Sequence, residues 1–364
     1  MEWGFLFCIS RYYSMPTRPL SLVLDNKKVS DLENRQSIFL DSNIWIDLAD
    51  NQSLESRQAK LLLLELVLKG AVFCPVSITS LLELFLQEYD SAIREAELMD
   101  TLSLNVTFRP KGEIVDEEIS AFVMSLSNDA IVVPQANLNY SQLFAPAAAF
   151  IGSRMNLAYP ENASSDFVDD ASLKLENKMK GLGVAGLVNL FKAHLPMRDW
   201  KNDFSTEMYS EIFKERREIS KGNRKEAREI EKYSVLRSEL VPRLINYVAQ
   251  LDPLPSSRAR NLIEAYVFSL EEKAGEILLK KIPSLRRYAE VLTITALDDS
   301  LKMSPNHMMD VENMIVPPIY SNVFVARDRW VKAMMSDMTM QSTNKAQCLF
   351  SIKELISYCD NLKG

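Results

Sequence analysis

Short apolar runs and longer amphipathic stretches alternate in the first third of the chain. The runs at 37–40, 71–77 and 105–110 each combine Phe with Val or Ile, which is typical of buried strands. The stretches that follow the first two runs have helical spacing, strongest at 57–69, and Gly70 stands where the residue after a helix C-terminus belongs. Strands that alternate with helices predict a parallel sheet.

The alternation stops after residue 110 and returns near the end of the chain. A helix is expected at 305–316, and a strand followed by a helix at 320–335 and again at 347–362. We therefore predict an α/β fold with a Rossmann-like parallel sheet flanked by helices and interrupted by a large, mainly helical insertion. The expected parts are an N-terminal extension (1–36), the first part of the core (37–110), the insertion (111–299) and the second part of the core (300–364).

The composition of the chain says more about its possible chemistry than about its fold. The chain has 364 residues, and 47% of them are hydrophobic, which is enough for a sizeable core. Its net charge of −7 means that a nucleic-acid site must depend on local basic patches. Two histidines argue against a His-rich zinc site and a Ser-His-Asp triad, so carboxylates are the expected reactive groups. No signal peptide or membrane span is recognisable, so we expect a cytoplasmic protein without a membrane partner.

Asp41 ends the first apolar strand and is followed by polar Ser42 and Asn43. In open α/β sheets, ligands bind outside the carboxyl ends of the strands, which is where this carboxylate is expected. It can be a metal ligand, or it can simply be the N-cap of the next helix. The local sequence does not decide between the two.

Three more acids fall at related positions. Glu83 lies in the helix after the second strand, Asp310 in the helix before the late strand, and Asp328 at the end of that strand. In a parallel sheet these four acids can meet at one edge, and clustered carboxylates suit Mg²⁺ or Mn²⁺. Such an ion polarises a phosphoryl oxygen and lowers the pKa of a bound water.

Each acid also has a local explanation. Ser80 and Glu83 have the spacing of a capping box, and Asp41 and Asp328 can cap helices. Asp310 can be an ordinary solvated helix residue. A metal site is favoured because the four acids would otherwise share one edge by coincidence.

The chain resembles the PIN-domain nucleases in four segments: LDSNIWID around Asp41, CPVSITSLLE leading to Glu83, MMDVENM around Asp310, and VFVARD ending at Asp328. The resemblance covers about 37–110 and 300–362. It implies a small Rossmann-like sheet whose four acids bind Mg²⁺ or Mn²⁺ and hydrolyse RNA, usually single-stranded. It also gives Asn43 the position of a small polar residue that supports the first Asp. Ala326 is a departure, because family members often carry Thr or Ser there.

The expected function is therefore that of a metal-dependent endoribonuclease acting on single-stranded RNA, with a role as a toxin or defence effector. Arg327, Arg329 and Lys332 flank Asp328 and are candidate contacts to substrate phosphates. Expected partners are nucleic acid and either a regulatory protein, such as an antitoxin, or a second copy of the chain. Two alternatives stay open: the same chemistry on DNA, and a catalytically inactive PIN-like binding or regulatory module.

Overall fold

The computed structural model describes residues 17–125, 138–158, 164–194, 218, 241–244, 261, 280–297, 305–336 and 345–363. These ranges hold all of the predicted first core part and most of the second. Much of the expected insertion lies outside the described residues. This includes a segment rich in basic and acidic residues at 214–232, apart from Glu218.

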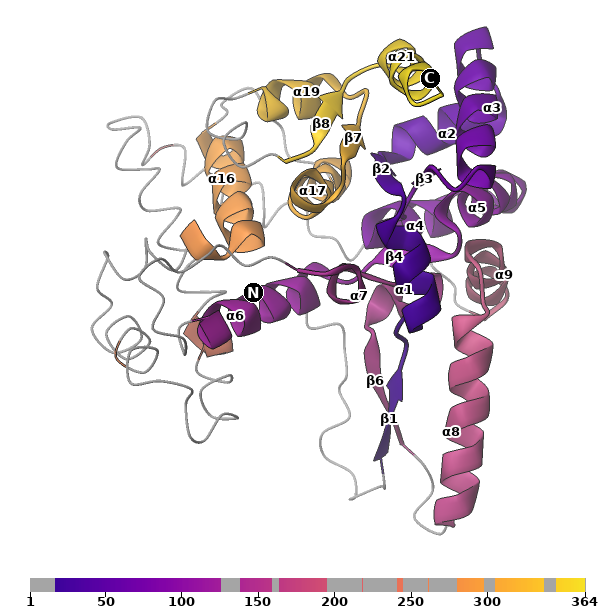
Figure 1. Cartoon of the computed structure of the whole chain (residues 1–364), viewed down its shortest axis with the longest axis vertical. Helices are drawn as coiled ribbons and strands as arrows, with labels where there is room; N and C mark the ends of the chain where they lie inside the picture. Colours follow the sequence, from indigo (N-terminus) through magenta and orange to yellow (C-terminus); the bar gives the residue numbers. More distant parts are fainter. Residues whose placement is uncertain are drawn as a thin grey trace.

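Among the described residues, four parallel strands form the central sheet in the order β3-β2-β7-β8 (Figure 1). They are β2 (Gln36–Leu40), β3 (Val72–Phe73), β7 (Val323–Val325) and β8 (Gln347–Leu349). Strand β2 pairs with both β3 and β7, and β7 pairs with β8. The predicted α/β fold with a parallel sheet is confirmed, and its strands come from both sides of the long middle region.

The predicted strand at 105–110 lies beside this sheet. It is β4 (Val106–Phe108), and a parallel bridge joins its Thr107 to Val76, just beyond β3. On its other side β4 pairs antiparallel with β5 (Phe144–Pro146). The middle region therefore adds an antiparallel strand, β5, at the edge of an otherwise parallel arrangement, as is common in large sheets.

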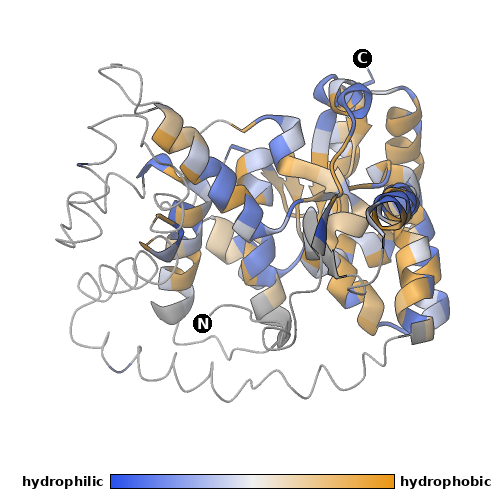
Figure 2. Ribbon diagram, turned by 90° about the horizontal axis from the view of Figure 1, so that it is seen from below, coloured by the Kyte–Doolittle hydropathy of each residue, from blue (hydrophilic) through white to orange (hydrophobic). Residues whose placement is uncertain are grey.

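Both faces of the sheet are covered, and β2 shows why. Ile38 and Leu40 point into one hydrophobic cluster and Phe39 into the other, because successive side chains of a strand point to opposite faces. Figure 2 shows hydrophobic residues, in orange, on the strands and on the helices that pack around them. The first cluster packs helices α2 (Ser42–Asp50), α3 (Leu54–Leu68), α4 (Ile78–Leu86), α5 (Tyr89–Ser103), α9 (Val184–His194) and α21 (Ile352–Asn361) and the 3₁₀ helix η1 (Ala147–Ile151).

The second cluster holds Phe39 and Phe324, whose rings stack at 5.4 Å between centroids. It is covered by α1 (Asn26–Glu33), α6 (Lys111–Ser125), α7 (Tyr140–Leu143), α16 (Pro283–Leu297), α17 (Pro305–Asn313) and α19 (Arg329–Met335). The short helix α18 (Pro317–Tyr320) leads into β7.

The N-terminal extension joins the middle region in a separate two-stranded ribbon. Strand β1 (Thr17–Ser21) pairs antiparallel with β6 (Arg154–Ala158), and helix α8 (Ser165–Lys180) lies alongside (Figure 1). The backbone N–H of Ser21 donates to the Glu176 carboxylate on α8, at 3.0 Å.

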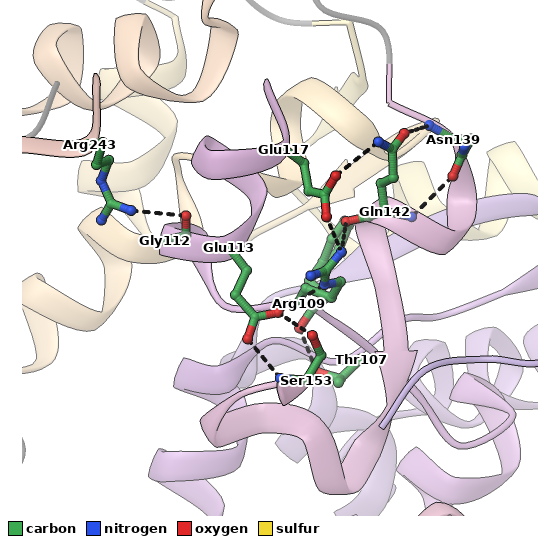
Figure 3. A network of polar contacts seen from close by, with 10 residues as sticks. Thr107, Arg109, Gly112, Glu113, Glu117, Asn139, Gln142, Ser153 and Arg243 are labelled. Atoms are coloured by element: carbon green, nitrogen blue, oxygen red, sulfur yellow. Dashed lines mark hydrogen bonds and ion pairs between the residues drawn. The ribbon is translucent and has the colours of Figure 1, made fainter. Parts of the chain in front are cut away.

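Partly buried polar contacts around Arg109 tie α6 to the segments next to it (Figure 3). Arg109 donates through Nε to Glu113 (2.9 Å) and through Nη1 to Glu117 (3.1 Å) and to the carbonyl of Gln142 (3.2 Å). Glu113 in turn accepts from the backbone N–H of Ser153, at 2.7 Å. The first helix of the expected insertion is therefore packed firmly on the core; the boundaries at 110/111 and 299/300 stay a prediction.

A fully buried carboxylate in the middle of α6, that of Glu118, joins this helix to two others. Glu118 accepts hydrogen bonds from the backbone N–H of Ser284 (3.0 Å), from the Ser284 hydroxyl (2.7 Å) and from the Tyr320 hydroxyl. It thus connects α6, α16 and α18.

The predicted helix that ends before Gly70 is confirmed. The helix predicted at 57–69 is α3, and Gly70 follows it with φ +73°, as expected for a helix C-terminal glycine. In the described part of the chain, no helix is both long and apolar enough to cross a membrane.

Candidate functional site

Asp41 connects β2 to α2, and its side chain does not cap the helix. Its backbone has the N-cap conformation, yet the carboxylate accepts no capping hydrogen bond. The side chain is only 3% exposed. Oδ1 accepts from Nδ2 of Asn313 at 3.2 Å, whereas Oδ2 is buried without a hydrogen-bond partner among the described residues. Helix capping therefore does not explain this acid.

Asp328 has a local role as well as a place at the site. It is the N-cap of α19, and its Oδ1 accepts from the backbone N–H groups of Trp330 (2.7 Å) and Val331 (3.1 Å). Both bonds use Oδ1, so Oδ2 takes no part in the cap. The predicted capping function is present, and one carboxylate oxygen remains for other contacts.

The capping box predicted between Ser80 and Glu83 is wrong. Helix α4 begins at Ile78, and its N-cap is Ser77, whose hydroxyl accepts from the backbone N–H of Ser80 at 3.1 Å. Glu83 is therefore in the second turn, where no free backbone N–H needs a cap. Burial raises its pKa to about 7, the Ser42 side chain lowers it by a hydrogen bond, and the charge of Asp41 raises it.

Asp310 shows that the four acids lie close together. Burial raises its pKa to about 8, and the charges of Asp41, Asp328 and Glu83 add to the effect in that order. Burial likewise raises the pKa of Asp41 to about 6, although hydrogen bonds from Ser42 and Asn313 oppose the shift. The structure thus brings the other three acids within electrostatic reach of Asp310, next to the carboxyl ends of β2 and β7, where Asp41 and Asp328 lie. Their role as metal ligands stays a prediction.

A chain of buried hydrogen bonds positions the Asp41 side chain. The side-chain oxygen of Asn313, at the end of α17, accepts from the hydroxyls of Ser77 (2.8 Å) and Thr79, while its Nδ2 donates to Asp41. Sequence reasoning did not find Asn313, although it lies three residues after Asp310 and hence on the same side of the helix. Asn43, expected to support Asp41, is exposed, and among the described residues the side-chain support comes from Asn313.

Another buried acid extends the cluster away from the sheet edge. Glu95 on α5 accepts a hydrogen bond from Nε2 of Gln87 at 2.7 Å. Burial raises its pKa to about 7; the bond from Gln87 lowers it, and the charges of Glu83 and Asp50 raise it. Glu95 was not predicted, because nothing in its helical surroundings distinguishes it from a solvated acid.

The three basic residues near Asp328 differ in their surroundings. Arg327 forms an ion pair with Asp47, whose side chain is 4% exposed. Arg329 is exposed on the first turn of α19, and Lys332 is exposed with its Nζ 5.5 Å from the centre of the Phe350 ring. Arg329 and Lys332 are therefore better placed than Arg327 to contact a ligand.

The donor set fits a hard divalent cation in its chemistry. Carboxylate oxygens are the preferred ligands of Mg²⁺ and Mn²⁺, and Asp41 offers a buried oxygen that lacks a partner among the described residues. In this conformation, however, no three His, Cys, Asp or Glu side chains of the described ranges are arranged to hold an ion. Binding would therefore require side chains to turn towards one another, and charge neutralisation by the cation would favour that movement.

Searches for similar protein-family models, curated proteins and solved structures gave no match for this chain.

Proposed function

We propose that this protein is a divalent-metal-dependent phosphodiesterase, an endoribonuclease that cleaves single-stranded RNA with Mg²⁺ or Mn²⁺ as cofactor. Asp41, Glu83, Asp310 and Asp328 would hold the cation. The resemblance of four short segments to PIN-domain nucleases suggests RNA as the substrate.

One observation supports this proposal most strongly. Oδ2 of Asp41 is buried beside three further acids and accepts no hydrogen bond from the described residues. An ionised carboxylate that is removed from water and surrounded by like charges is costly unless a positive partner compensates it. A bound cation would supply that compensation.

The cation and the side chains around it would have different roles. The cation would supply Lewis acidity towards a phosphoryl oxygen and a lowered pKa for water. Asn313 fixes the orientation of Asp41, and the Ser77 and Thr79 hydroxyls fix Asn313. Without a cation, Asp310 holds its proton at neutral pH, because burial and the neighbouring acids raise its pKa to about 8.

Exposed basic residues would position the substrate. Arg329 and Lys332 lie within one turn of Asp328, where contacts to phosphate oxygens would fix the register of a nucleic-acid strand. The overall charge of −7 would oppose binding elsewhere on the molecule.

Cleavage of end-labelled single-stranded RNA tests the proposal. The wild-type protein should cleave with Mn²⁺ and stop with EDTA, and Asp41→Asn and Asp328→Asn should each reduce the rate by at least about a hundredfold. Asp360→Asn, an exposed position on α21, is the matched control. Undiminished cleavage by both site variants would refute the proposal, and single-stranded DNA of the same base order tests the choice of substrate.

A binding or regulatory module without catalysis is the second candidate. It is favoured by Ala326, which is fully buried and supplies no hydroxyl two residues before Asp328. A folded protein that binds RNA yet gains no thermal stability from Mn²⁺ would support this alternative.

A further inference from the structure

Helix α3 carries a row of exposed leucines on its outer face. Leu54 is 78% exposed, Leu61 67% and Leu68 85%. They are seven residues apart, so they lie two helical turns from one another on the same side. The opposite face of α3 is buried in the core through Ala59, Leu62, Leu63 and Leu66, and the exposed row takes no part in that core.

The row has charged neighbours at symmetric positions. Arg57 lies four residues before Leu61, and Glu65 lies four residues after it. Leu64 adds a half-buried apolar side chain next to the row. Glu65 also pairs with Lys69, with Nζ at 2.8 Å, and with Lys363.

We propose that α3 is a homodimer interface, in which α3 of a second copy of this chain packs antiparallel to it about a two-fold axis at Leu61. Leu54 of one copy then meets Leu68 of the other at both ends, and the two Leu61 side chains meet at the axis. The same patch on both copies makes a closed pair, and the seven-residue spacing is that of a coiled-coil seam.

Charge decides between the two directions of packing. In the antiparallel pair, Arg57 of each copy lies at the same height as Glu65 of the other copy, across the seam. Both of these contacts therefore pair a positive with a negative side chain. A parallel pair would place Arg57 beside Arg57 and Glu65 beside Glu65, and like charges at such short range are unfavourable.

The location of α3 is compatible with a second copy. It lies beside α21 at the C-terminal end of the molecule (Figure 1). Because a single pair of 15-residue helices is smaller than a standard interface of about 1,600 Å², we expect a dimer that dissociates at micromolar concentrations. The inference does not depend on the proposed nuclease activity.

Sedimentation equilibrium of the full chain over the micromolar range tests the interface. The wild type should shift from monomer to dimer, and Leu61→Glu should weaken dimerisation by at least about tenfold. Leu173→Glu, at a similarly exposed leucine on α8, should leave it unchanged. Melting temperatures establish that each variant is folded. A wild type that stays monomeric, or a Leu61→Glu variant that dimerises normally, would overturn the proposal.

A charge exchange tests the direction of packing. Arg57→Glu and Glu65→Arg should each weaken the dimer, because each places like charges across the seam, and the double variant should restore it. Under mild oxidation Leu61→Cys should form a disulfide-linked dimer, whereas Leu54→Cys should do so only when combined with Leu68→Cys. Failure of the double charge variant to recover, together with no cross-link at Leu61→Cys, would contradict the antiparallel pair.

Discussion

Asn313 donates a hydrogen bond to Asp41 across a sequence separation of 272 residues, at 3.2 Å. The bond joins the end of α17 to the end of β2, so it connects the two parts of the core that the middle region separates. Because the other end of the Asn313 amide accepts from Ser77 and Thr79, its NH₂ group is directed at the carboxylate. The position of Asp41 is thus set by residues from two other segments of the chain.

Replacing Asn313 should damage both stability and the site. Asn313→Ala removes the donor to Oδ1 of Asp41, while the Ser77 and Thr79 hydroxyls keep the hydrogen bond to each other, so the free energy of unfolding should fall by about 1–3 kcal/mol. Urea unfolding at neutral pH measures the loss. Asn361→Ala, at an exposed position on α21, is the control and should change stability by less than about 0.5 kcal/mol. An Asn313→Ala variant as stable as the control would show that the hydrogen bonds of Asn313 do not contribute to the stability of the protein.

The raised pKa values predict an unusual pH dependence. Burial and neighbouring charge raise the pKa of Asp310 to about 8 and that of Glu83 to about 7, well above their ordinary values near 4. Between about pH 4 and about pH 8 the folded protein therefore binds more protons than the unfolded chain, so stability falls as pH rises through this window. Above the folded-state pKa values the loss is complete.

Asp310→Asn provides the test of that dependence. The amide cannot ionise, so at about pH 8 with EDTA the variant should be at least about 1 kcal/mol more stable than the wild type, and the two should converge near pH 4. Urea unfolding at several pH values gives both curves. Part of the slope should persist, because Glu95 and Glu118 also have a pKa of about 7. A variant that is less stable than the wild type at about pH 8 would show that the Asp310 carboxylate is favourably paired.

The strand ends at Asp41 and Asp328 could be predicted from sequence, because an abrupt change from apolar to polar residues marks where a buried strand ends. The capping role predicted for Glu83 was wrong because the sequence offers two possible starts for its helix. Both Ser77 and Ser80 are plausible N-caps by composition, and only the start of α4 at Ile78 decides between them.

Asn313 and Glu95 could not be predicted in the same way. Each is an ordinary polar residue of an amphipathic helix, and each becomes buried only because that helix packs against segments far away in the chain. Strand β5 was missed for a related reason, since three residues carry too little periodicity to be separated from their surroundings.

Divalent cations should stabilise the protein through the carboxylate cluster. At a Mn²⁺ concentration of about 100 times the dissociation constant, the free energy of unfolding should rise by about 2.7 kcal/mol. At one fixed Mn²⁺ concentration the rise should be larger near pH 8 than near pH 6, because the ligands must lose their protons to bind the cation. Thermal unfolding with Mn²⁺ and with EDTA measures the difference. Asp41→Asn should abolish the gain, and Asp360→Asn should keep it. An equal gain in both variants would place the cation elsewhere.

Arg327 and Arg329 are adjacent in sequence but should have separable roles. Arg327→Ala removes the ionic partner of Asp47, whose side chain is 4% exposed, and should destabilise the protein by about 1–3 kcal/mol; the figure is below that for a fully buried pair because the arginine itself is 55% exposed. Arg329 is exposed, and Arg329→Ala should change stability by less than about 0.5 kcal/mol. If Arg329 contacts a phosphate, the same variant should weaken RNA binding and reduce the slope of log affinity against log salt by about 0.7. Urea unfolding and RNA titrations at several salt concentrations separate the two effects.

Adding Asp47→Asn to Arg327→Ala should recover part of the lost stability, because it removes the unpaired negative charge that Arg327→Ala leaves at Asp47. A further loss of stability in the double variant would show that Asp47 is stabilised by other contacts.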